Sequence, residues 1–129
     1  MAQHDVELIV LKQVASYLAM PIFLVDLVGN LLYYNEPAEA ILGRRYDETG
    51  EMPIEEWSSI FVPLAEDGTP LAPHELPLAI AVGEQRPAHG SMHITGLDGL
   101  AHHIEVTAFP LDGQSGRRLG SIAIFWEDT

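Results

Sequence analysis

The sequence predicts a single α+β domain, in which an N-terminal helix and a β-hairpin are followed by several short helices and three strands. Apolar residues recur at helical spacing in Asp5–Leu18. The last third of the chain instead holds three runs of strand-favouring residues, separated by turns rich in Gly and Asp. A length of 129 residues suits one compact domain. We therefore divide the chain into an N-terminal helix, residues 1–19, and the domain proper, residues 20–129.

Composition narrows the classes of partner. With 47% hydrophobic residues, the chain can bury enough apolar area to offset the entropy of ordering. The 19 acidic and 6 basic residues give a formal net charge of −13, which opposes binding to nucleic acid and to anionic membranes. No apolar run reaches the roughly 18 residues of a membrane span, and Met1–Glu7 lacks the basic start of a signal peptide. We expect a cytoplasmic protein with no nucleic acid and no membrane as partner.

The sequence contains few of the residues and motifs that enzymes use. The chain has no cysteine, which excludes disulfides, thiolate nucleophiles and cysteine-ligated metals. It lacks the GxSxG, glycine-rich phosphate-loop and HExxH motifs. The best acid–base group, Asp98 and Glu105 beside His103, is explained by a hairpin alone. We expect no enzymatic activity and assign no catalytic residue.

The predicted N-terminal helix is apolar on two sides. One line comprises Val6, Ile9, Val10, Gln13, Val14 and Tyr17. A second line comprises Leu8, Leu11, Ala15 and Leu18. A helix that is apolar nearly all round needs two partners in so small a protein, so we expect it to contact its own domain and a second copy. The second line predicts a homodimer, with an interface made of Leu8, Leu11, Ala15 and Phe125.

Turn and cap residues delimit the next elements. Ile22–Val25 and Leu31–Tyr34 are predicted strands, joined by a turn at Gly29-Asn30 into a hairpin. Asn35 is a good N-cap for the short helix that follows. Gly43 suits the end of that helix because glycine readily adopts the left-handed conformation.

The second half of the chain changes from helices to strands. After an irregular stretch, we expect a helix at Pro53–Trp57, a loop at Ala65–Pro73 and a helix at His74–Val82 that Gly83 caps. Three strands forming an antiparallel meander then follow, at Ala88–Thr95, His102–Leu111 and Arg118–Trp126.

Four strings in the chain are similar to the sequence pattern of one known family. They are Phe23–Asn30 (FLVDLVGN), Tyr34–Ala38 (YNEPA), Leu97–Gly99 followed by Ile104–Leu111 (LDG and IEVTAFPL), and Leu119–Thr129 (LGSIAIFWEDT). On these strings the chain from Ile22 to Thr129 resembles a PAS domain. The resemblance implies a five-stranded antiparallel sheet with short helices across one face. It also implies a role as the input module of a sensor kinase or phosphatase, with an output domain or protein as partner.

The face of such a sheet that the helices cover would enclose a pocket for a small ligand. Strand alternation and the predicted helices supply the candidate lining residues, which are Phe23, Val25, Leu32, Tyr34, Ile41, Trp57, Ile60, Leu78, Val82, Ile104, Val106, Ile122 and Ile124. Two interpretations remain open. The pocket binds a fatty acid or another hydrophobic metabolite, and the module signals through a rearrangement of its dimer. Alternatively, the core is filled and the domain is a protein interaction and dimerisation module.

The resemblance also allows cofactors to be weighed. A flavin sensor of the light-oxygen-voltage type and the chromophore of a photoactive yellow protein both need a cysteine, which the chain lacks. For haem, the only candidate axial ligand is His74, between Pro73 and Pro77, where a polar helix-end residue is the commoner role. Non-covalent FAD would need an aromatic residue such as Trp57 or Trp126, and large aromatics are more often core residues. We expect neither haem nor flavin, and the identity of any ligand stays open.

Histidines gather in the predicted strands. If Asp98-Gly99 forms a two-residue turn, His93 and His102 become diagonal neighbours on one face of the hairpin. Such a pair could bind zinc or sense pH. Strand histidines that face solvent are the commoner case, and a shift of one residue in the register would separate the pair. We assign no metal ligand.

Overall fold

The computed structural model of the chain describes residues 3–128, without the side chains of residues 3–5, 8 and 114. The elements are α1 Gln3–Tyr17, β1 Ile22–Val25, β2 Leu31–Tyr34, α2 Glu36–Leu42, α3 Tyr46–Thr49, α4 Ile54–Ile60, η1 Pro73–Glu75, α5 Pro77–Glu84, β3 Ala88–Thr95, β4 Ala101–Asp112, η2 Gln114–Gly116 and β5 Arg118–Glu127. This order confirms the predicted α+β arrangement, and the three last strands begin and end within one residue of their expected bounds. Within the described part of the chain, no helix is long and apolar enough to cross a membrane.

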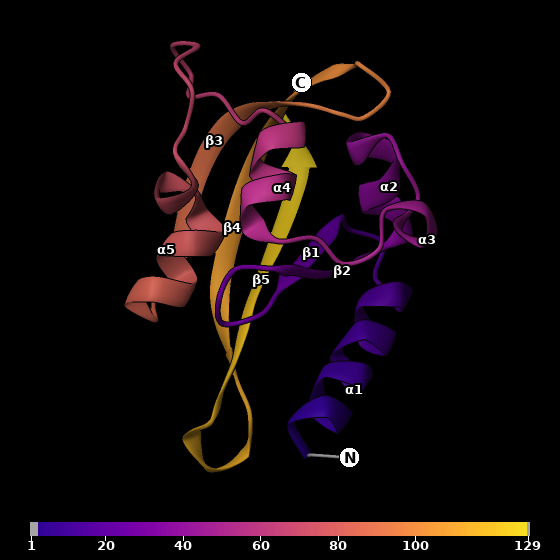
Figure 1. Cartoon of the computed structure of the whole chain (residues 1–129), viewed down its shortest axis with the longest axis vertical. Coiled ribbons are helices and arrows are strands. Elements are labelled where there is room, and N and C mark those ends of the chain that lie inside the picture. Colours follow the sequence, from indigo (N-terminus) through magenta and orange to yellow (C-terminus); the bar gives the residue numbers. More distant parts are fainter. Residues whose placement is uncertain (1–2, 129) are drawn as a thin grey trace.

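One five-stranded antiparallel sheet forms the centre of the domain, with the strand order β2-β1-β5-β4-β3. β1 and β5 come from opposite ends of the chain and pair in the middle of the sheet. α4 and α5 lie across one face of it, in front of the long strands (Figure 1). The main cluster of buried apolar side chains fills the space between this face and the helices.

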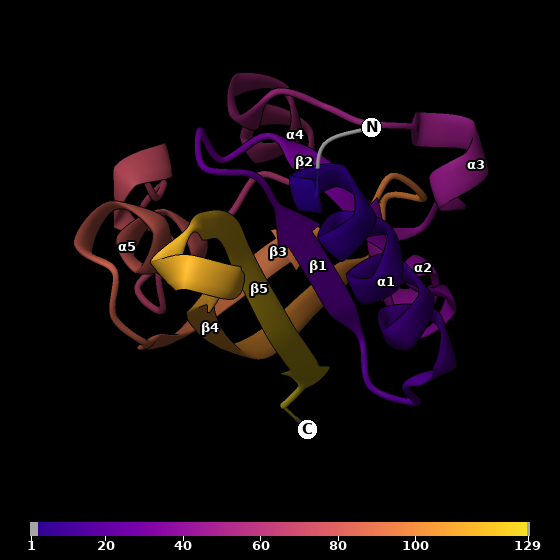
Figure 2. The ribbon, with the colours of Figure 1, turned by 90° about the horizontal axis from the view of Figure 1, so that it is seen from below.

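α1 lies outside this layer of helices and runs beside β1 (Figure 2). Two ion pairs attach its length to the domain. Glu7 pairs with Arg117, which lies just before β5. The Nζ atom of Lys12 lies 3.9 Å from the Oε2 atom of Glu51. The end of α1 is held by hydrogen bonds from a buried side-chain amide.

That amide belongs to Asn35, whose side chain is entirely buried (0% exposed). Its Oδ1 atom accepts hydrogen bonds from the backbone N–H groups of Ile22 (2.9 Å) and Ala38 (3.3 Å). Its Nδ2 atom donates to the carbonyl oxygens of Ala15 and Met20, both at 2.9 Å. Asn35 is therefore the N-cap that the sequence predicted for α2, and it also joins the end of α1 to the start of β1.

The predicted hairpin is confirmed, and its turn is closed by a side chain. The Oδ1 atom of Asp26 accepts hydrogen bonds from the N–H groups of Val28 and Asn30, both at 2.9 Å. Gly29 has φ 97°, a left-handed conformation that other residues rarely adopt. Gly43 ends α2 in the same conformation, with φ 81°, as expected.

The stretch predicted to be irregular after Gly43 contains one more helix, α3. Tyr46 begins it, and the Tyr46 hydroxyl donates a hydrogen bond to the carbonyl of Leu32. The Tyr46 ring packs against Tyr33 and Tyr34 with centroid distances of 5.2 and 5.4 Å, and burial raises its pKa to about 12. These contacts span more than ten residues of sequence, so local propensity did not indicate the helix.

The prediction of one helix over His74–Val82 with a cap at Gly83 is wrong at both ends. Leu76 is extended (φ −74°, ψ 143°), because a residue that precedes proline avoids the helical region. Pro77 then begins α5, while the residues before Leu76 form the separate turn η1. Gly83 lies inside α5, which ends at Glu84 and is capped by Gln85, with φ 53°.

Replacing the buried amide tests its structural role. Asn35→Ala removes buried hydrogen bonds to the backbone of Ile22, Ala38, Ala15 and Met20, so we expect it to lower the free energy of unfolding by roughly 2–4 kcal/mol. The chain offers one matched control, Asn30→Ala, whose half-buried amide makes bonds of 3.3 and 3.4 Å and should contribute about 1 kcal/mol or less. Urea denaturation followed by circular dichroism measures both values. Equal losses would contradict the assigned role of Asn35.

Candidate functional site

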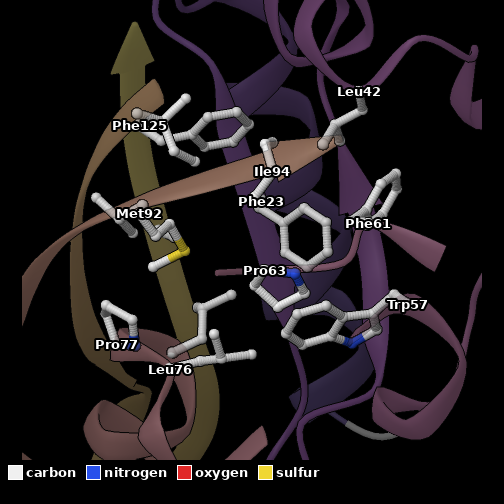
Figure 3. A pocket seen from close by; sticks show the side chains of 14 residues that line it. Phe23, Leu42, Trp57, Phe61, Pro63, Leu76, Pro77, Met92, Ile94 and Phe125 are labelled. Carbon is white, nitrogen blue, oxygen red and sulfur yellow. The ribbon is translucent and has the colours of Figure 1, made fainter. Parts of the chain in front are cut away.

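A cavity of about 70 Å³ lies between the sheet and the helices (Figure 3). It is lined by Phe23, Leu42, Trp57, Phe61, Pro63, Leu76, Pro77, Leu78, Met92, Ile94, Ile104, Val106, Ala123 and Phe125. All of these side chains are hydrocarbon, aromatic or thioether groups, apart from the indole nitrogen of Trp57. The cavity is therefore an apolar site within the core.

Cross-strand pairing explains how the sheet supplies half of this lining. Phe23 of β1 lies opposite Ala123 of β5, so both side chains point to the same face. Met92 of β3 likewise lies opposite Ile104 of β4. Because side chains alternate along a strand, the remaining sheet residues of the lining follow two positions away from these.

The wall opposite the sheet is fixed by Trp57 of α4. Its Nε1 atom donates a hydrogen bond of 2.9 Å to the carbonyl oxygen of Gly29. Its ring meets Phe23 edge to face, with the centroids 5.0 Å apart. Because the one polar atom of the indole is satisfied by the backbone, the ring presents only apolar surface to the cavity.

The volume of this cavity limits the size of the ligand that it can hold without a change in its lining. Apolar cavities of about 150 Å³ bind benzene or xenon, and 70 Å³ is about half of that volume. A long acyl chain fits only if the lining moves. The described lining also offers no charged group to a carboxylate head. The sequence offers Arg44, Arg45 and His74 as partners for such a head group. However, Arg45 pairs with Asp47 at 3.1 Å, and neither Arg44 nor His74 lines the cavity.

Five of the predicted lining residues line the cavity, namely Phe23, Trp57, Leu78, Ile104 and Val106. Others belong to the surrounding core without reaching the cavity, namely Val25, Tyr34, Ile41, Ile60 and Val82. The placement of Leu32, Ile122 and Ile124 is corrected, because these half-buried residues do not line it.

Register accounts for these corrections. Every residue from Ile122 to Phe125 is apolar, so alternation alone did not show which face of β5 points inward. Pairing with β1 sends Ala123 and Phe125 to the cavity and the two isoleucines to the other face. In β2, a register shift opposite Val25 buries Leu31 in place of Leu32. Met92 and Ile94 were missed, although they alternate with the more polar Ser91, His93 and Thr95 in β3.

The expected dimer interface is also corrected. Ala15 is 2% exposed and Leu11 is half-buried, so this side of α1 packs on its own domain. Phe125 is 4% exposed and lines the cavity. The side chain of Leu8 lies outside the described residues. The other line of α1 is exposed by 46–80% at Val6, Ile9, Val10, Val14 and Tyr17.

A second cluster lies on the sheet face opposite the cavity. The loop between β3 and β4 runs from Gly96 to Leu100, so it is longer than the expected two-residue turn. The register therefore shifts by one residue, and His93 lies opposite His103, with their rings stacked at 4.5 Å. The predicted pair of His93 with His102 is wrong, because His102 lies opposite Ile94 and its Nδ1 atom is 3.2 Å from Glu127.

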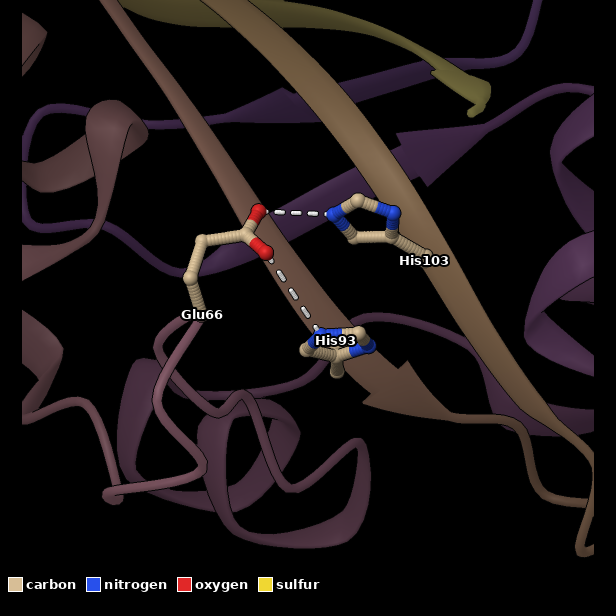
Figure 4. Close-up of side chains that lie close together, drawn as sticks. All are labelled: Glu66, His93 and His103. Atoms are coloured by element: carbon tan, nitrogen blue, oxygen red, sulfur yellow. Dashed lines mark hydrogen bonds and ion pairs between the residues drawn. The ribbon is translucent and has the colours of Figure 1, made fainter. Parts of the chain in front are cut away.

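Glu66, from the loop after α4, joins the two stacked rings (Figure 4). Its Oε1 atom lies 2.6 Å from the Nε2 atom of His103, and its Oε2 atom lies 3.7 Å from the Nε2 atom of His93. The hydrogen bond to Glu66 raises the pKa of His103 above its ordinary value.

Comparison with known proteins agrees with this fold. No protein-family model and no curated protein matches the chain. The PAS domain of Bordetella pertussis BvgS matches with a TM-score of 0.62 and 17% identity, over 95% of this chain and 86% of that one. A PAS domain from a two-component sensor histidine kinase matches with a TM-score of 0.64 and 13% identity, over 96% and 98%. The light-state dimer of the fungal blue-light photoreceptor Vivid matches with a TM-score of 0.63 and 14% identity, over 84% and 78%.

These similarities cover nearly all of the chain. The chain therefore has the fold of a PAS domain, a five-stranded antiparallel sheet with helices across one face, as its sequence strings predicted.

A pair of substitutions tests the face assignment of the strands. Ile104→Ala enlarges the cavity and should lower the free energy of unfolding by roughly 2–5 kcal/mol. Ile124→Ala removes the same atoms from the opposite, half-buried face and should cost under about 2 kcal/mol. Chemical denaturation gives both values. A loss at Ile124 that matches or exceeds the loss at Ile104 would reverse the assignment.

Proposed function

We propose that the chain is a sensor module of signal transduction, and that its apolar cavity binds a small apolar ligand. The observation that carries this proposal is the cavity itself, which is wholly apolar and lies between the sheet and α4 and α5. The fold of the chain is similar to that of a PAS domain from a sensor histidine kinase and to that of a blue-light photoreceptor. Fold likeness supports the sensing role, and the site supports the class of ligand.

The cavity favours a ligand smaller than a fatty acid. A volume of about 70 Å³ and the absence of a charged group in the described lining fit a compact molecule without a head group. Two prolines and Leu76 contribute to the wall opposite the sheet, at the start of α5 and in the loop before η1 (Figure 3). These segments are the parts that would have to move to admit a larger molecule.

A chain of contacts leads from the cavity to α1. The ring of Phe23 forms part of the cavity wall. The neighbouring residue Ile22 donates its N–H to Asn35, and Asn35 donates to Ala15 at the end of α1. We infer that a ligand which displaces Phe23 changes the position of α1 through these bonds, and that α1 passes the signal to an output domain or protein.

A second copy of the chain is the proposed partner of α1. The exposed line of α1 has the i, i+3, i+4 spacing of a helix that packs against another helix. It covers about three turns, and one face of such a helix can pair with itself across a two-fold axis. Ligand-dependent rearrangement of this homodimer would be the output. If the core stays filled, the same face supports the second candidate function, a dimerisation and interaction module.

Xenon tests the cavity and its link to α1 together. We expect dissolved xenon to shift the methyl resonances of Ile104 and Val106 saturably, and to shift amide resonances in the last turn of α1. Ala123→Leu fills the cavity from the sheet and should abolish both effects, provided that its circular dichroism stays native. No saturable shift in the wild type would rule out an accessible cavity. Shifts at the cavity without shifts in α1 would contradict the proposed link from the cavity to α1.

A charge on the exposed line tests the dimer. We expect sedimentation velocity to show a dimer for the wild type and a monomer for Val10→Arg, because an arginine at a helix interface leaves a buried charge without a partner. Val28→Arg is the matched control, since Val28 is 73% exposed in the hairpin turn and should keep the dimer. A monomeric wild type, or a dimeric Val10→Arg variant, would refute the proposed interface.

A further inference from the structure

Three side chains from three separate segments converge on the sheet face opposite the cavity. His93 lies in β3, His103 lies in β4, and Glu66 lies in the loop between α4 and η1 (Figure 4). Each offers one ligand atom, and these atoms all lie within 4.8 Å of one another. Donor atoms around one tetrahedral zinc ion are about 3.4 Å apart, as follows from metal–ligand bonds of about 2.0–2.1 Å. Small side-chain rotations therefore bring these atoms to the spacing of a metal centre.

Backbone pairing fixes the positions of both histidines and anchors the loop that carries Glu66. His93 and His103 lie directly opposite each other in the β3–β4 ladder. Leu64 exchanges two backbone hydrogen bonds with His93, at 2.8 and 2.9 Å. Glu66 follows two residues later, in the turn that the hydrogen bond from Gly68 N–H to the carbonyl of Ala65 closes, and its carboxylate reaches the two rings. Neither histidine depends on a flexible loop for its place.

The donor set suits a divalent transition metal. Two imidazole nitrogens and one carboxylate oxygen are common zinc ligands, and a site with three protein ligands keeps a position open for water. Both Nε2 atoms point to the same carboxylate, whereas an ordinary surface ion pair needs only one histidine. The His93 and His103 side chains are 40% and 31% exposed, so an ion can enter from solvent.

A second carboxylate lies on the far side of His103. The Nδ1 atom of His103 is 3.8 Å from the Oδ2 atom of Asp128. Carboxylates that accept a hydrogen bond from the non-ligating nitrogen of a histidine hold the ring in the tautomer that presents the other nitrogen to a metal, and Asp128 lies a few tenths of an ångström beyond that distance. Here that nitrogen is Nε2, which faces Glu66. The negative charge of Glu66, Glu105 and Asp128 also attracts a cation to this part of the sheet.

We propose that Glu66, His93 and His103 bind a divalent transition metal ion of the zinc class, which fastens the loop after α4 to strands β3 and β4. This loop includes Phe61 and Pro63, which line the cavity on the other side of the sheet edge. Val62 between them has a left-handed backbone with φ 45°, which a β-branched residue adopts only under strain. The ion would hold this strained segment closed. The metal site does not depend on the cavity having a ligand.

Titration calorimetry of the full, tag-free chain tests the site with Zn²⁺ as the probe. After treatment with a chelator, we expect the wild type to bind one Zn²⁺ per chain. Glu66→Ala, His93→Ala and His103→Ala should each weaken binding by about tenfold or more. His89→Ala is the matched control, because His89 lies on the same strand and face but outside the cluster, and it should bind as the wild type does. If the three cluster variants bind Zn²⁺ as tightly as the wild type, or if the wild type shows no saturable binding, the proposal is overturned.

Two further measurements test separately whether the ion binds at the cluster and whether it fastens the loop after α4 to the strands. Co²⁺ in place of Zn²⁺ should give the visible absorption of a four-coordinate ion in the wild type and in His89→Ala, but not in His93→Ala. Amide hydrogen exchange should slow across residues 62–72 when Zn²⁺ is added to the wild type. If Zn²⁺ binds at the cluster and exchange in this segment does not change, the ion does not fasten the loop and that part of the proposal is wrong.

Discussion

The buried amide of Asn35 joins the end of α1, the first residue of β1 and the first turn of α2, and much of the domain is arranged around it. Its two atoms bind the backbone of Ile22, Ala38, Ala15 and Met20. Water does not reach this group, so its loss would leave buried backbone partners such as the N–H of Ile22 unsatisfied. β1 in turn pairs with β2 and β5, so this side chain links the end of the N-terminal helix to the sheet, in addition to the two ion pairs along the helix.

Both faces of the sheet carry sites built on the same strand pairing. On the inner face, β1, β3, β4 and β5 supply half the wall of an apolar cavity. On the outer face, the register of β3 with β4 stacks His93 on His103. The loop after α4 takes part in both sites, because Phe61 and Pro63 face the cavity while Glu66 reaches the histidines. A ligand on one face and an ion on the other would therefore act on the same segment.

Local residues predicted the elements well, whereas long-range pairing decided the sites. Asn35, Gly29 and Gly43 carry their turn or cap chemistry in the sequence, and the resemblance to a PAS domain implied a five-stranded antiparallel sheet with helices across one face. The inward face of β5 was not predictable, because both of its faces are apolar and only the pairing of β1 with Ala123 sets the direction. α1 is also apolar on two sides, so its pattern did not show which side packs on the domain. The histidine pair depended on the length of one turn, where a single residue changes the face.

Amide hydrogen exchange of the unmodified chain tests most directly the claim that Asn35 makes one cooperative unit of α1, β1 and α2. If the claim holds, the amides in the last turn of α1 open with the same free energy as those of β1 and the first turn of α2, because breaking one set of bonds to Asn35 exposes them all. If α1 instead exchanges at the rate of an isolated helix while β1 and α2 stay protected, the helix is an independent appendage and the claim is wrong.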